Sequence, residues 1–74
     1  MSREYVVVVE KSESGFGAFV PDLPGCVAVA DTHEEAVELI REAIQLHIDS
    51  LREHGEPVPT PSATVETVVV HTAA

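Results

Sequence analysis

One amphipathic pattern, over residues 33–54, constrains the fold more than any other feature of the sequence. Thr32 and Glu35 form the S/T-x-x-E pattern of a helix start, and Gly55 followed by Pro57 is a typical helix stop. At 100° per residue the apolar side chains span an arc of roughly 200°, whereas packing on one sheet needs about 100° or a little more. The sequence therefore predicts one long helix that keeps spare apolar surface after covering a sheet.

Four other apolar runs have the composition of β-strands. Residues 4–10 contain four consecutive valines and are apolar on both alternating faces, as is usual for a central strand. Residues 16–20 and 26–30 are two further short runs. Residues 64–70 form the last one, after the proline-rich connection 56–62. We therefore expect three strands before the helix and one after it.

The fold class predicted from this order is α+β, with the topology β-β-β-α-β. Short links make the first three strands an antiparallel meander, and a right-handed crossover through the helix places the fourth strand beside the first. The expected sheet order is 3-2-1-4, with the helix packed on one sheet face. In this order residues 64–70 form a valine-rich edge, which proteins normally avoid.

The length of 74 residues allows one domain, 1–74, and we expect no C-terminal DNA-binding domain in it. A chain this short buries only about 60% of its unfolded surface and usually needs a disulfide, a metal or a partner subunit. Cys26 is the single cysteine, so no disulfide forms within the chain. We therefore expect a homodimer or tetramer, with Leu39, Leu46, Val68 and Val70 at its interface.

The helix length supports the same expectation. Some 21 helical residues span about 32 Å, whereas a six-residue strand spans about 20 Å. The end of the helix, with Leu46, Ile48 and Leu51, should therefore overhang its sheet and be open to association.

The charge balance limits the possible partners. Thirteen acidic residues against four basic ones give a formal net charge of −9. Such a chain does not suit direct binding to nucleic acid or to an anionic membrane, but it attracts a basic protein. The N-terminus has only five apolar residues in a row, too few for an export or membrane segment, and a free thiol favours the cytoplasm.

Side chains that carry chemistry show no catalytic or metal-binding pattern. No two of the four histidines have the i, i+3 or i, i+4 spacing of helical metal ligands, and Cys26 has no basic neighbour to make it a nucleophile. Glu10, Asp22 and Asp31 are the residues that a metal-dependent nuclease of reduced ribonuclease H type would use. The structural alternative is that Asp22 braces its own turn and Asp31 caps the helix. We expect no catalytic residue, no metal and no cofactor.

A family resemblance covers nearly the whole chain. The motifs that carry it are the P-D-L-P-G-C turn at 21–26, the D-T-x-E-E-A helix start at 31–36 and the G-x-x-V-P-x-P-S exit at 55–62. Together they resemble the N-terminal domain of HicB-type antitoxins, although Ala30 replaces the glycine that the family carries before D-T.

The resemblance implies both a fold and a function. The fold is a β-β-β-α-β domain like a truncated ribonuclease H fold, usually dimeric or higher. The function is to bind a HicA-type toxin, a small basic mRNA-cleaving ribonuclease, and to cover its RNA-binding and catalytic surface. The motifs assign partner binding to Pro21, Asp22, Leu23, Pro24, Gly25, Glu34 and Glu35. An orphan oligomeric scaffold and the metal-dependent nuclease remain alternatives.

Overall fold

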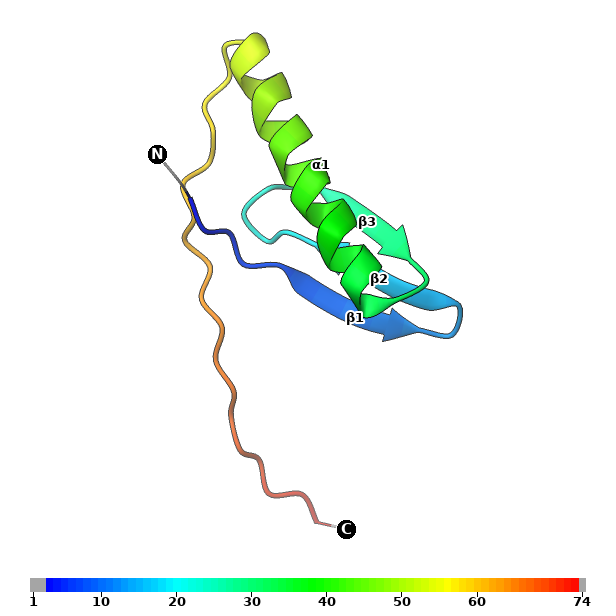
Figure 1. Cartoon of the computed structure of the whole chain (residues 1–74). Coiled ribbons are helices and arrows are strands. Elements are labelled where there is room, and N and C mark those ends of the chain that lie inside the picture. The colour runs from blue at the N-terminus through cyan, green and yellow to red at the C-terminus, as the bar shows by residue number, and fades with distance from the viewer. Residues whose placement is uncertain (1–2, 74) are drawn as a thin grey trace.

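The computed structural model describes residues 3–73 and contains three strands followed by one helix (Figure 1). The strands are β1 (Val8–Ser12), β2 (Gly15–Phe19) and β3 (Val27–Ala30), and the helix is α1 (His33–Glu53). The α+β class and the three-stranded meander are therefore confirmed.

The sheet has the order β1-β2-β3, with both pairs antiparallel. Val9 lies opposite Ala18, and Ala18 lies opposite Ala28. These three side chains share one sheet face because strand residues alternate between faces. The helix packs on this face, and the core contains Ala18, Val20, Leu23, Cys26, Ala36 and Ile40.

Both predicted ends of the helix are confirmed. The Oγ1 atom of Thr32 accepts a hydrogen bond of 3.1 Å from the backbone N–H of Glu35. At the other end Gly55 has φ +67°, and its N–H donates to the carbonyl of Arg52 while that of Glu56 donates to Leu51. This pair of bonds is the Schellman motif, which satisfies carbonyls at the helix end.

The helix keeps exposed apolar side chains after it packs on the sheet, as expected. Fewer of them than expected are exposed at the C-terminal end of the helix. Leu46 is 70% exposed and Leu39 is 42% exposed, so both are available for association. Ile48, in contrast, is buried and Leu51 is half-buried. The prediction that the helix end exposes all three apolar residues is therefore wrong for Ile48, since the N-terminal segment runs beside that end of the helix.

The fourth strand and the order 3-2-1-4 do not occur in the described single chain. Within residues 3–73, segment 64–70 pairs with no strand, and β1 is an edge of the sheet instead of a central strand. The first strand is also shorter than predicted, because ladder pairing begins at Val8. Figure 1 shows the C-terminal part of the chain leaving the body of the domain, and it does so after Ala63, which is still hydrogen-bonded to Asp22.

Candidate functional site

The loop that joins β2 to β3 is closed by its own backbone. The N–H of Leu23 donates to the carbonyl of Val20 at 3.1 Å, and the N–H of Cys26 donates to that of Leu23 at 3.1 Å. The N–H of Val20 also donates to the carbonyl of Cys26 at 3.3 Å. Gly25 has φ +84°, the value that the third residue of a type II turn requires. The predicted turn over residues 23–26 is confirmed.

Leu23 anchors this loop in the core. Its side chain is completely buried, whereas Pro21, Pro24 and Gly25 on either side are exposed. A side chain with no exposed surface cannot itself touch a partner. The structure therefore separates the motif into one buried residue that holds the loop and several exposed residues that a partner can reach.

Asp22 does not brace its own turn but binds the chain 40 residues later. Its Oδ1 accepts a bond of 2.9 Å from the hydroxyl of Ser62, and its Oδ2 accepts bonds of 3.0 Å from the backbone N–H groups of Ser62 and Ala63. We call this set of three bonds the Asp22 clasp. It joins two of the sequence motifs, the turn at 21–26 and the exit at 55–62.

The clasp lowers the pKa of Asp22, chiefly through the backbone bond from Ala63, then the bonds from Ser62. An aspartate whose folded-state pKa is depressed stabilises the fold at pH values above its unfolded-state pKa, about 3.9. This contribution is lost as the pH falls through the lowered folded-state value. The clasp is therefore complete at neutral pH and opens only in strong acid.

Substitution of Asp22 by asparagine is expected to open the clasp at neutral pH. The amide keeps the shape of the carboxylate but replaces one acceptor oxygen by a donor, which then faces N–H or O–H donors. We expect amide hydrogen exchange at Ser62 and Ala63 to accelerate by about tenfold or more, measured by NMR. Asp31→Asn, at an exposed position, is the control and should leave both rates unchanged. Unchanged rates in Asp22→Asn would contradict the clasp.

The start of the helix carries the other predicted contact residues. Glu34 and Glu35 are exposed and, with Glu38 and Leu39, line a shallow hollow of about 300 Å³. Glu38 is also paired with Arg41 on the same helix. Among the described residues the loop 21–25 does not border this hollow. The structure thus shows two separate exposed features, a loop and an acidic helix start, instead of one joint pocket.

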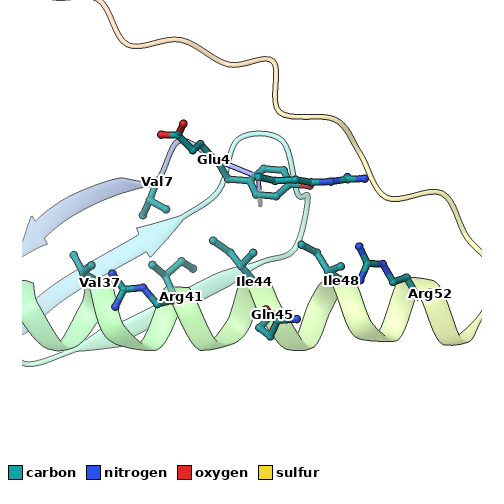
Figure 2. A pocket seen from close by; sticks show the side chains of 11 residues that line it. Glu4, Val7, Val37, Arg41, Ile44, Gln45, Ile48 and Arg52 are labelled. Atoms are coloured by element: carbon teal, nitrogen blue, oxygen red, sulfur yellow. The ribbon is translucent and has the colours of Figure 1, made fainter. Parts of the chain in front are cut away.

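A larger groove of about 680 Å³ lies between the N-terminal segment and α1 (Figure 2). Figure 2 shows Val37, Ile44 and Ile48 on the side of the helix that faces the N-terminal segment, where Val7 lies. Three arginines border this apolar floor: Arg3, Arg41 and Arg52. They are three of the four basic residues in a chain with thirteen acids. Sequence reasoning missed the groove, although Arg41 and Arg52 each follow an apolar floor residue by four positions.

The residues considered as metal ligands or as a nucleophile do not form a catalytic site. Within residues 3–73, no three His, Cys, Asp or Glu side chains are grouped so that they could hold a metal ion. Glu10, Asp22 and Asp31 therefore do not form the site that a metal-dependent nuclease would need. Burial raises the pKa of the Cys26 thiol, which disfavours the nucleophilic thiolate. Within residues 3–73, no helix is both long and apolar enough to cross a membrane.

Fold and site together define a small α+β domain whose candidate functional features are a clasped loop, an acidic helix start and an open groove. The chain belongs to the HicB-like antitoxin family of bacterial toxin–antitoxin systems, because the model of that family matches residues 5–73.

Similar proteins support this assignment. A UPF0150 protein of Thermoplasma acidophilum is 41% identical over 69 residues, which are 92% of this chain and 97% of that protein. Antitoxin HicB 2 of Photorhabdus laumondii is 34% identical over 68 residues, which are 92% of this chain but 49% of that protein. A chain of the solved HicA3 and HicB3 toxin–antitoxin complex matches with a TM-score of 0.70 and 30% identity, covering 81% of this chain and 70% of that one.

Proposed function

We propose that this protein is an antitoxin that binds a small basic HicA-type ribonuclease and covers its RNA-binding and catalytic surface. The observation that carries this proposal is the similarity, over most of the chain, to a chain from a solved toxin–antitoxin complex. Family membership over residues 5–73 points the same way. In this proposal the protein inhibits by binding, catalyses no reaction, takes no cofactor and acts in the cytoplasm, where the mRNA is.

The surface of the domain suits a basic target. A formal net charge of −9 raises the rate of encounter with a cationic protein and disfavours direct binding to RNA or DNA. Glu34 and Glu35 extend from the helix start, and Pro21, Pro24 and Gly25 form an exposed loop. We propose these five residues as contacts, with Asp22 and Leu23 fixing the shape of the loop. Binding to a HicA-type protein would favour this function, whereas absence of binding would favour the alternative, an orphan oligomeric scaffold.

The test is binding to the tagged product of an adjacent gene that encodes a small basic HicA-type protein. We expect a stable complex whose association rate falls as salt is raised, because charge steers the encounter. The double variant Glu34→Gln/Glu35→Gln should associate about tenfold more slowly at low salt, measured by surface plasmon resonance.

The matched control is Glu13→Gln/Glu53→Gln, which removes the same charge at two exposed positions away from the helix start. An equal loss of rate in both double variants would show that the overall charge, and not the helix start, steers binding. No complex at all would reject the antitoxin function and leave the orphan scaffold.

A further inference from the structure

The segment 64–70 has the composition of a strand but pairs with no strand within the described part of the single chain. Four of its valines are between 73% and 84% exposed: Val65, Val68, Val69 and Val70. Its sequence is β-branched at six of seven positions, which favours extended pairing. Exposed apolar residues in such a run normally mark a surface that pairs with another chain.

The sheet of the same chain has a free edge with which such a segment can pair. β1 is paired on one side by β2 and has no strand on its other side within residues 3–73. The groove lined by Val7, Val37, Ile44 and Ile48 lies between the N-terminal segment and α1. A strand added to the free edge of β1 would therefore pass under the helix and cover this apolar floor. Its backbone would meet the unpaired N–H and C=O groups of the edge.

Charge makes the two features complementary as well. Glu66 is the only charged residue of the segment, and Arg3, Arg41 and Arg52 border the groove. All three arginines are exposed, Arg41 is paired with Glu38, and Glu4 also lines the groove. An acid that enters there therefore gains a modest attraction that salt screens, and charge assists the pairing without dominating it.

The connection before the segment directs it away from its own groove. The phenolic hydroxyl of Tyr5 donates a bond of 2.6 Å to the carbonyl of Pro59, and the Asp22 clasp holds Ser62 and Ala63. Pro61 stiffens the chain between these two anchors, and Pro57 stiffens it just before them. Figure 1 shows the described chain continuing from them in an extended form, away from the sheet.

We propose that two copies of this protein exchange segment 64–70 reciprocally. Each segment pairs with the free edge of β1 in the other copy and fills the groove between the partner's N-terminal segment and helix. The exchange supplies the fourth strand of the predicted 3-2-1-4 order in trans, and it gives a very small core the additional buried surface that it needs. The inference is independent of the proposed toxin target.

The test uses the full chain in two isotopic forms. Equal amounts of a ¹⁵N,²H-labelled and a ¹³C-labelled chain are unfolded together in urea, refolded and examined by filtered NOE spectroscopy and sedimentation equilibrium. The proposal predicts a dimer with NOE contacts between residues 5–9 of one chain and 65–70 of the other. A monomer, or contacts confined to one chain, would overturn it. Protection of the segment only after a toxin is added would also overturn it.

Variants separate this interface from other apolar surfaces. Val68 and Val69 point to opposite faces of an extended strand, so one of them enters the groove in any register. Val68→Asp/Val69→Asp should raise the dimer dissociation constant about a hundredfold or more, while far-UV circular dichroism stays that of a folded domain. Val29→Asp, at a 77% exposed position on the sheet face away from the helix, should leave the dimer intact. The reverse pattern would overturn the exchange.

Discussion

Substitution of Leu23 by alanine is expected to lower the free energy of unfolding by about 2–5 kcal/mol, the usual cost of removing a buried leucine side chain. Leu23 is completely buried, and it is the large side chain in the middle of the loop that enters the core, between the buried ends Val20 and Cys26. A domain of 74 residues has about 4–11 kcal/mol of stability in total. The variant should therefore be partly unfolded near 37 °C, which urea titration followed by circular dichroism will show.

Leu46→Ala provides a matched control. It removes the same atoms from a side chain that is 70% exposed, and we expect a change within about 0.5 kcal/mol. If both leucine variants were equally destabilised, Leu23 would not be the anchor of the loop. A Leu23→Ala variant as stable as the wild type would contradict the complete burial of this side chain.

Substitution of Gly15 by alanine is expected to cost about 2–4 kcal/mol. Gly15 begins β2 with φ +155°, and a Cβ atom there would lie 2.4 Å from the carbonyl oxygen of Ala30. This oxygen belongs to the backbone of β3 and cannot swing aside as the tip of a side chain can. The chain would have to move β2 away from β3, which weakens the sheet next to the start of the helix.

Gly17→Ala is the control for that variant, two residues along the same strand. A Cβ atom at Gly17 would lie 4.0 Å from the carbonyl oxygen of Ala28, which is ordinary van der Waals contact. We expect Gly17→Ala to keep the urea midpoint of the wild type within the range of surface substitutions, about 0.5 kcal/mol. A midpoint for Gly15→Ala that equals that of Gly17→Ala would contradict the close approach of β2 and β3.

Features set by neighbouring residues were predictable from the sequence. The helix start at Thr32, the stop at Gly55 and the type II turn with Pro24 and Gly25 each depend on backbone preferences within a few positions. The family resemblance depended on the same short motifs, and the family model confirms it. Local chemistry was therefore enough for the elements and for the family.

Features set by distant residues were not predictable in this way. Asp22 was expected to bond within its own turn, but its donors are Ser62 and Ala63, and the sequence gives no direct sign of which distant N–H groups it meets. The predicted position of residues 64–70, as a fourth strand beside the first, was wrong for a similar reason. Their composition predicts pairing, but composition does not say which chain supplies the sheet. The groove depends on how far the N-terminal segment lies from the helix, which only the packing decides.

The clasp gives a physical reason for two of the motifs to occur together. The aspartate of the 21–26 turn and the serine of the 55–62 exit are the two sides of one set of hydrogen bonds. The bonds hold the exposed loop and the connection after the helix in a fixed relation. A surface that is fixed before binding loses less entropy when a partner docks on it.

The most direct test of the central proposal is RNA cleavage by a HicA-type toxin encoded beside this protein, with the protein titrated into the reaction. The antitoxin function predicts that cleavage falls steadily and stops near equimolar protein, and that toxin and protein then co-purify. Cleavage that continues undiminished in the presence of excess folded protein would contradict it.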